Sequence, residues 1–365
     1  MKLNELTSFL ESIAPLAFQE EYDNSGLIVG RADQEIKSAL ISLDCTEAVV
    51  DEAISKGCQL IISHHPIVFK GLKKFNGKNY VERVVMKAIK HDIALYAIHT
   101  NYDNVVDGVN KALAEQIGLT QLQILSPKPA IFKKLITYCP IEQAEKVRQA
   151  IFRAGAGEVG DYTECSFNTQ GTGTFKAAAG ANPFVGKIGE RHEENEVRVE
   201  AVYTVDREAA LVQQLIEAHP YEEVPYELFN LDNPNREIGS GMLGELPEAQ
   251  NELDFLQMLK MQLGCAVIRH TELRAKKIRR VAICGGSGSF LFPQAVRAGA
   301  DIFITADYKY HEFFDADGQI IIADVGHYES EQFTQKLLFE TISKKFPNFA
   351  LHLTKQNTNP VKYLT

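Results

Sequence analysis

Short apolar runs alternate with amphipathic segments along the first hundred residues, and this alternation restricts the fold more than any other feature of the chain. The runs at residues 26–29, 39–43, 59–62 and 93–98 have the length of buried strands, and residues 46–56 and 80–90 place apolar side chains on one face of a helix. Strands that alternate with helices are joined by crossovers, which make neighbouring strands parallel. The pattern therefore predicts an α/β fold with a largely parallel sheet.

The order of the elements changes after residue 125. The run Ser126-Pro127-Lys128-Pro129 reads as a linker. Beyond it we expect a strand at 134–138, a helix at 141–154, strands near 162–167, 174–179 and 197–205, a helix at 208–218 and a strand at 224–229. This order resembles a ferredoxin-like βαββαβ module. The α/β rhythm returns from Gly241, with helices at 253–263 and 328–345 and strands at 280–284, 302–305 and 319–323.

These changes predict how the chain divides into domains. We expect a discontinuous α/β core domain of two similar halves, residues 1–125 and 240–365, interrupted by an inserted ferredoxin-like α+β domain at residues 126–239. A length of 365 residues agrees with more than one domain. Within the insert, the run from Ala218 to Tyr226 resembles the corresponding run of the trimeric cation-tolerance and nitrogen-regulatory proteins.

Composition excludes several classes of function. The net charge of −10 argues against non-specific binding to nucleic acid or to a membrane surface, which relies on basic side chains. No stretch approaches the roughly 20 apolar residues that span a bilayer, and residues 1–5 lack the pattern of a signal peptide, so we expect a cytoplasmic protein. The six cysteines show no Cys-x-x-Cys spacing, which favours buried free thiols.

The run Ser63-His64-His65-Pro66 places two imidazoles where a predicted strand ends. Pro66 cannot donate a hydrogen bond to a sheet, and it biases the preceding residue away from helix. In open α/β sheets, ligands bind at the carboxyl ends of strands. Two neighbouring imidazoles on an irregular turn can face two different ions, although a pair of polar turn residues explains the run equally well when it stands alone.

Three further side chains follow other predicted strand ends. Asp103 lies a few residues after the strand at 93–98, and His327 and Glu331 stand four residues apart at the start of the last helix, where this spacing puts them on one face. Alone, Asp103 is explained as a turn or cap residue and Glu331 as a favourable charge near a helix N-terminus. Nitrogen and oxygen ligands without thiolate suit Zn, Fe(II), Mn or Mg, and five side chains are more than one tetrahedral ion requires. The combination predicts a dinuclear metal site formed by His64, His65, Asp103, His327 and Glu331.

Two other segments offer polar groups close to a strand end. Asp307 and His311 follow the strand at 302–305 and are candidates for proton transfer or substrate contact. The run from Gly285 to Ser289 lies between a strand and a helix, where it forms either a phosphate-binding nest or a tight structural turn. It lacks the lysine of a Walker motif, and both interpretations stay open.

Five motifs together resemble the family of GTP cyclohydrolase 1 type 2, or Ngg-interacting-factor-three-like, proteins. The motifs are Tyr22-Asp23-Asn24-Ser25-Gly26-Leu27, Ser63-His64-His65-Pro66, His99-Thr100-Asn101-Tyr102-Asp103, the run from Thr305 to Glu312, and Gly326-His327-Tyr328-Glu329-Ser330-Glu331. The resemblance implies that His64, His65, Asp103, His327 and Glu331 each bind one of two adjacent divalent metals. It also implies a ring-shaped, toroidal homohexamer, whose metal sites face an inner cavity and whose inserted modules cap the openings.

Two classes of function remain as hypotheses, and we favour an enzyme. Paired ions lower the pKa of a bound water, which makes a hydrolase the expected enzyme class. The family name implies hydrolytic opening of the imidazole ring of GTP, and the same site could hydrolyse a phosphoester of a nucleotide. The alternative is a metal-dependent scaffold or regulator that uses the inserted module to bind a partner.

Overall fold

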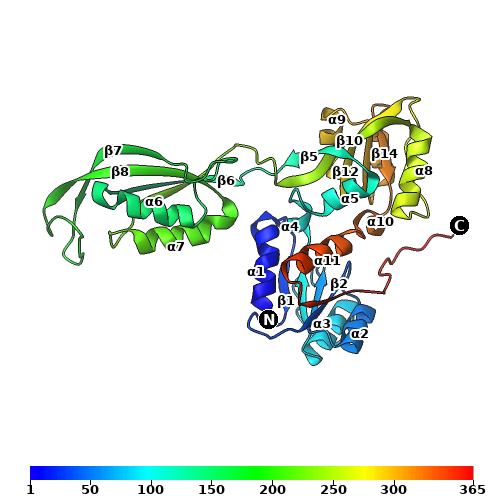
Figure 1. The fold of residues 1–365 in the computed structure, drawn as a ribbon, viewed down its shortest axis with the longest axis horizontal. Coiled ribbons are helices and arrows are strands. Elements are labelled where there is room, and N and C mark those ends of the chain that lie inside the picture. The colour runs from blue at the N-terminus through cyan, green and yellow to red at the C-terminus, as the bar shows by residue number, and fades with distance from the viewer. Residues whose placement is uncertain (365) are drawn as a thin grey trace. The chain divides into compact units, whose positions relative to one another are not determined.

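The computed structural model describes residues 1–364, and these residues form two compact units (Figure 1). The first unit contains Met1–Pro127 and the chain from Arg236 onward, and the second contains Lys128–Asn235. In residues 1–364, the first unit has two sheets and the second has a sheet of its own. None of the helices in this range has both the length and the apolar character needed to cross a membrane.

The first sheet of the first unit carries the His-His run at the end of its central strand. Among the described residues its strands are, in spatial order, β1 (Gly26–Val29), β4 (Ala94–Ala97), β3 (Leu60–Ser63), β2 (Ser38–Ser42) and β15 (Ala350–Leu353). All neighbours are parallel except β1, which pairs antiparallel with β4 at the edge. β15 joins from the far end of the chain, and the sequence patterns do not predict a strand there.

Two helices cover one face of this sheet. Apolar side chains of β2, β3 and β4 pack in one core against α2 (Glu47–Lys56) and α3 (Tyr80–Lys90). Each helix begins with a side-chain cap, because Val49 donates its backbone N–H to Thr46 and Glu82 donates its backbone N–H to Asn79. These local signals agree with the observed helix starts and fix where the loop between β3 and α3 ends.

The second sheet of the first unit is mixed. Among the described residues its strands are, in spatial order, β11 (Arg269–His270), β14 (Ile321–Asp324), β13 (Ile302–Ala306), β12 (Lys277–Ser287), β10 (Gly239–Asn251) and β5 (Thr120–Pro127). Only β12, β13 and β14 run parallel. The helices α5 (Val109–Ile117) and α8 (Glu252–Leu263) pack on one face, and α9 (Phe292–Arg297) packs on the other.

The sequence analysis missed two strands of this sheet, β5 and β10. The expected linker begins inside β5, where Pro127 pairs with Gly239 of β10. β5 alternates polar and apolar residues only over residues 121–124, β10 shows no sustained alternation, and both strands contain Pro, so the sequence analysis missed them. The single helix that the sequence analysis expects at residues 328–345 is interrupted in the structure. It forms two helices, α10 (His327–Glu331) and α11 (Thr334–Lys345). The break allows α10 to contact β12 while α11 packs on β2 and β15.

The second unit is a four-stranded antiparallel sheet with helices packed against it. Among the described residues its strands are, in spatial order, β7 (Phe167–Lys176), β8 (Arg191–Thr204), β6 (Phe132–Pro140) and β9 (Tyr226–Asn230). The helices α6 (Ala144–Arg153) and α7 (Glu208–Ala218) share a core with β6 and β8. The two strands expected near 162–167 and 174–179 are one strand, β7, because polar residues between them pair with β8 without interruption.

Candidate metal centre

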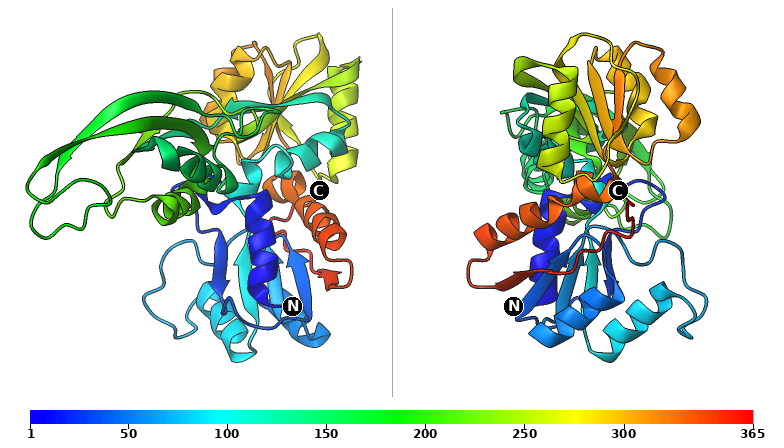
Figure 2. Two further views of the ribbon diagram at one scale, coloured as in Figure 1. Left: turned by 60° about the vertical axis from the view of Figure 1, so that its left-hand side comes forward. Right: turned by 90° about the vertical axis from the view of Figure 1, so that its right-hand side faces the viewer.

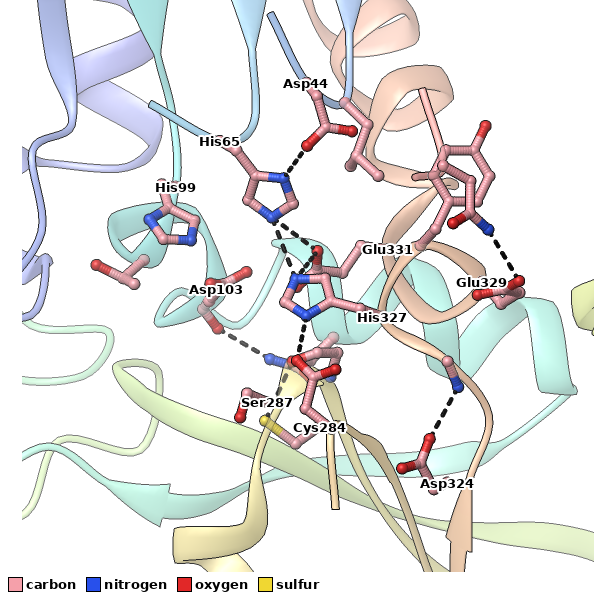
Figure 3. Close-up of a pocket in the computed structure, with 18 of the residues that line it drawn as sticks. Asp44, His65, His99, Asp103, Cys284, Ser287, Asp324, His327, Glu329 and Glu331 are labelled. Atoms are coloured by element: carbon pink, nitrogen blue, oxygen red, sulfur yellow. Dashed lines mark hydrogen bonds and ion pairs between the residues drawn. The ribbon is translucent and has the colours of Figure 1, made fainter. Parts of the chain in front are cut away.

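The five predicted ligands lie together in the first unit, at the carboxyl ends of strands from both of its sheets. His64 and His65 follow β3, Asp103 ends α4 (Thr100–Asp103), and His327 and Glu331 begin and end α10. Figure 3 shows the side chains of His65, Asp103, His327 and Glu331 turned towards a common centre. Strand ends are the usual position of ligand sites in α/β sheets, and here two sheets contribute to one site.

The ligand atoms form two groups that share Glu331. In the first ligand group, His64 Nε2 lies 3.6 Å from Asp103 Oδ1 and 3.8 Å from Glu331 Oε1. In the second ligand group, Glu331 Oε2 lies 3.0 Å from the Nε2 atoms of both His65 and His327. The two oxygens of Glu331 therefore face different groups, so that one carboxylate is shared by both.

Each imidazole of the site is fixed through its other ring nitrogen. His64 Nδ1 lies 2.8 Å from the carbonyl oxygen of Ile98, and His65 Nδ1 lies 2.8 Å from Asp44 Oδ1. His327 Nδ1 lies 2.7 Å from Asp307 Oδ2. Such outer partners fix the tautomer and orientation of a metal-binding histidine and leave Nε2 free to bind the ion.

His99 is a fourth imidazole at the centre, and the sequence analysis did not select it as a ligand. Its ring centroid lies 5.2 Å from that of His64 and 5.3 Å from that of His65, and a ligand atom of His99 lies within 4.8 Å of those of both. His99 Nδ1 lies 2.7 Å from Asp23 Oδ1. The signal in the sequence was the position of His99 at the end of a strand, four residues before Asp103.

The atoms at the centre fit a divalent metal. His64 Nε2 and Asp103 Oδ1 are buried and make no hydrogen bond to any residue in 1–364. An unsatisfied buried polar group costs about 1–3 kcal/mol, a cost that a bound cation would remove. The donors are nitrogen and oxygen, which suit Zn, Fe, Mn or Mg. Burial raises the pKa of the nearby Cys284 thiol, which disfavours the thiolate form that a metal would require.

Three titratable groups of the centre, His65, His327 and Glu331, hold one another in charged forms. Burial alone would lower the pKa of His65, but hydrogen bonds to Asp44 and Glu331 raise it to about 10. Burial would likewise lower the pKa of His327, which Glu331 and Asp307 raise to about 11. Burial would raise the pKa of Glu331, yet the surrounding imidazoles hold it well below its usual range. The imidazoles of His65 and His327 are therefore protonated at neutral pH when no metal is bound.

Comparison with known proteins identifies the family. Residues 1–360 match the Duf34/NIF3 (NGG1p interacting factor 3) family. The chain belongs to the Duf34/NIF3 family. It is 36% identical to a Bacillus subtilis protein named GTP cyclohydrolase 1 type 2 homolog, with 99% of this chain and 98% of that protein covered, and 33% identical to a Staphylococcus epidermidis protein of the same name, with full coverage of both.

Solved structures agree with this assignment. A Bacillus cereus protein related to NIF3 superposes with a TM-score of 0.81 at 36% identity, over 100% of this chain and 99% of that chain. A Staphylococcus aureus protein superposes with a TM-score of 0.78 at 30% identity, with the same coverage. The resemblance inferred from the five motifs is thereby confirmed at the level of the family.

The structure gives the two candidate proton-transfer residues of this NIF3-family chain different positions. Asp307 lines the cavity and contacts His327, and this contact lowers the pKa of its carboxyl group. His311 is exposed on the short helix Tyr310–Ala316, its ring beside that of Tyr310, and it is not among the residues that line the cavity. Asp307 is thus placed to orient His327, whereas His311 is not brought to the centre.

The glycine run after β12 is a structural turn. The backbone N–H groups of Gly285, Gly286 and Gly288 are donated to Asn110, Ser330 and Thr305 respectively. An amide that already has a partner cannot cradle phosphate without losing that bond. Of the two interpretations that the sequence left open, the structure favours the tight turn.

Proposed function

We propose that this protein is a metal-dependent hydrolase that holds two divalent ions, one at each ligand group. The observation that carries the proposal is the bidentate position of Glu331, whose two oxygens serve both groups beside an open cavity. The cavity measures about 760 Å³, enough for a small organic substrate. Two divalent ions in such a site would lower the pKa of a bound water towards neutrality.

The side chains have separate roles in this proposal. His64 and Asp103 would hold one ion, His65 and His327 the other, and Glu331 both. Asp44 and Asp307 would keep His65 and His327 in the orientation that presents Nε2. The role of His311 as a proton shuttle stays a prediction.

The name of the relatives suggests the reaction to test first. Proteins named GTP cyclohydrolase 1 type 2 homolog point to hydrolytic opening of the guanine imidazole ring of GTP. Hydrolysis of a nucleotide phosphoester is the second candidate, since paired ions stabilise that reaction as well. The third is a metal-binding scaffold or regulator without catalysis.

The arrangement of the whole protein is part of the proposal. We take residues 1–125 and 240–365 as one discontinuous α/β domain and residues 126–239 as an inserted ferredoxin-like domain. The βαββαβ order of the second unit supports the second assignment. The resemblance to the family supports a toroidal homohexamer, and the composition supports a cytoplasmic location. Light scattering at micromolar concentration tests the assembly, and a monomer mass would contradict it.

The function is tested by incubating metal-loaded protein with a panel of nucleotides, GTP included, and following the products by mass spectrometry. The variant His65→Ala serves as the control, because it removes one ligand of the second group only. Ring-opened GTP that is absent with the variant would support the first reaction, and products of phosphoester cleavage would support the second. Full metal occupancy without turnover of any compound would favour the scaffold.

Metal content is a separate measurement. Elemental analysis of the purified protein should give about two divalent ions per chain. The variants His65→Ala and Glu331→Gln should hold fewer. A content unchanged in both would contradict the assignment of the ligands.

A further inference from the structure

The loop between β3 and α3 is rich in lysine, in contrast with the acidic character of the chain. Its residues Phe69 to Lys78, called the lysine loop below, contain Lys70, Lys73, Lys74 and Lys78. All four lysines are exposed, and none forms an ion pair with any residue in 1–364. Figure 2 shows this light-blue loop standing away from the body of the first unit in both views. Four unpaired cations in one exposed loop form a surface suited to an anion.

The lysine loop begins at the mouth of the metal cavity. Phe69 lines the cavity and stacks on Tyr22, with ring centroids 6.4 Å apart and planes inclined by 17°. The rings of Phe69 and His99 make an edge-to-face contact, with centroids 5.7 Å apart. Tyr22 is 65% exposed and Phe69 46% exposed, so a flat ring can reach both. Aromatic faces of this kind stack with bases and other planar rings.

The cavity itself repels anions. Seven carboxylates line it, namely Glu20, Asp44, Asp103, Asp307, Asp324, Glu329 and Glu331, and Arg269 is the single lysine or arginine among the lining residues. Two divalent ions and Arg269 would supply five positive charges against seven negative ones. A phosphate chain inside the cavity would therefore meet a net negative charge of two.

The groups that could hold phosphate inside the cavity already have partners. Arg269 binds Asp324 and donates to the carbonyl oxygen of Tyr308 at 2.9 Å. The amides of the glycine run are taken, as described above. Lys362, between the lining residues Val361 and Tyr363, donates its Nζ to the carbonyl oxygen of Asn359. The lysines nearest the cavity in sequence whose Nζ has no partner in residues 1–364 are those that follow Phe69.

We propose that the site takes a nucleoside phosphate with its ring directed inwards and its phosphates outwards. The ring stacks on Phe69 and Tyr22 and faces the ligand groups, while the phosphates lie against the lysine loop. This inference rests on the proposed function and specifies the orientation of the substrate. A ring that faces the metal centre is placed for attack on the ring itself, whereas phosphoester hydrolysis requires the phosphates to face the metal centre. The inference favours ring opening over phosphoester cleavage.

The test compares the binding of GTP and guanosine to metal-loaded protein by isothermal titration calorimetry. The test variant replaces Lys70, Lys73, Lys74 and Lys78 by Ala. The control variant replaces Lys37, Lys90, Lys276 and Lys277 by Ala, four exposed lysines of the first unit that line no part of the cavity and form no ion pair with any residue in 1–364. Both variants change the net charge equally, so long-range electrostatics is matched.

We expect the test variant to bind GTP about tenfold more weakly than the wild type, as expected for four exposed charge contacts, and to bind guanosine unchanged. The control variant should bind both compounds within about twofold of the wild type. Phe69→Ala should weaken guanosine and GTP alike, by about tenfold, because it removes stacking. Added salt should reduce the preference for GTP over guanosine.

Unchanged binding of GTP by the test variant would overturn the inference, as would an equal loss in the control variant. Binding of inorganic triphosphate that is as tight as that of GTP and independent of the four lysines would place the phosphates on the metals and overturn the orientation. Lysine-dependent binding of GTP without any turnover would leave the binding mode standing and remove the hydrolase. Turnover of GTP together with binding that does not depend on the four lysines would support the hydrolase and overturn the binding mode.

Discussion

Gly286 makes room for the carboxylate of Glu331, which the two ligand groups share. A Cβ atom built at residue 286 would lie 2.3 Å from Glu331 Oε1 and 3.2 Å from His327 Cε1, and the backbone at this position has a φ of +63°. The glycine run therefore serves the metal centre through its lack of side chains, since any side chain would displace the carboxylate that joins the two ligand groups.

Gly286→Ala should weaken metal binding by at least about tenfold, because Glu331 must move from its position between the two groups. Gly299→Ala is the matched control, since Gly299 has a φ of +68° but no atom within 4 Å of its Cβ position. Both variants should lose about 1 kcal/mol of unfolding free energy from backbone strain alone. Metal titration and denaturant unfolding separate the two effects, and equal metal affinity in both variants would contradict the role of Gly286.

Asp44→Ala should weaken the binding of one of the two ions by about 10- to 100-fold and leave the other unchanged. The reason is that Asp44 contacts His65, whose Nε2 lies 3.0 Å from Glu331 Oε2 in the second ligand group. Asp51→Ala is the control, because Asp51 forms an exposed ion pair with Lys87 away from the cavity. Competition with a chelating dye should show one weakened step out of two, and an equal loss in both steps would count against two separate groups.

Metal binding should release protons at neutral pH. The pKa values of His65 and His327, about 10 and about 11, mean that both imidazoles are protonated in the metal-free protein, whereas a ligand must be neutral. The apparent affinity should then rise by roughly tenfold per pH unit for each of the two groups as the pH increases from 7 to 9. Calorimetry with Mn²⁺ in buffers of different ionisation enthalpy counts the protons, and a release close to zero at pH 7.5 would refute the assignment.

Local signals in the sequence were sufficient for β1 to β4 of the first sheet and for the candidate ligands that follow two of these strands. The helix expected at residues 80–90 is α3, Tyr80–Lys90, because a capping Asn79 and a regular apolar stripe act within a few residues. The five candidate ligands lie close together because each follows a strand, and the carboxyl ends of strands from both sheets of the first unit face one centre. Periodicity and strand ends are properties of short segments, which a single sequence contains.

Contacts between distant segments were not predictable in the same way. Asp44 reaches His65 across 21 residues, and Asp23 reaches His99 across 76. The sequence shows Asp23 only as part of a turn, and nothing local indicates which imidazole it meets. The long strand β10 was missed for a similar reason, since its pairing with β5 and β12 overrides a composition that is unfavourable for strands.

Asp23 should act on the metal centre through His99. Its carboxylate accepts from His99 Nδ1 and from the backbone and hydroxyl of Thr100, and these bonds outweigh its burial and hold its pKa far below the usual range. Its contribution to the free energy of unfolding is therefore full above a pH of about 4 and is lost as the pH falls below that. Asp23→Asn should be less stable than the wild type at pH 7, by a margin that shrinks in acid.

His99→Ala and Asp23→Asn should each change the visible spectrum of the Co²⁺-loaded protein, because both alter the imidazole that lies beside His64 and His65. If Asp23 acts only by orienting His99, the double variant should bind Co²⁺ no more weakly than His99→Ala alone, since the two losses are not additive for residues in one hydrogen-bonded unit. His91→Ala is the control, because His91 is exposed at the end of α3 and lines no part of the cavity. Additive losses would show that Asp23 supports the centre by another route, and an unchanged spectrum in His99→Ala would place His99 outside the metal site.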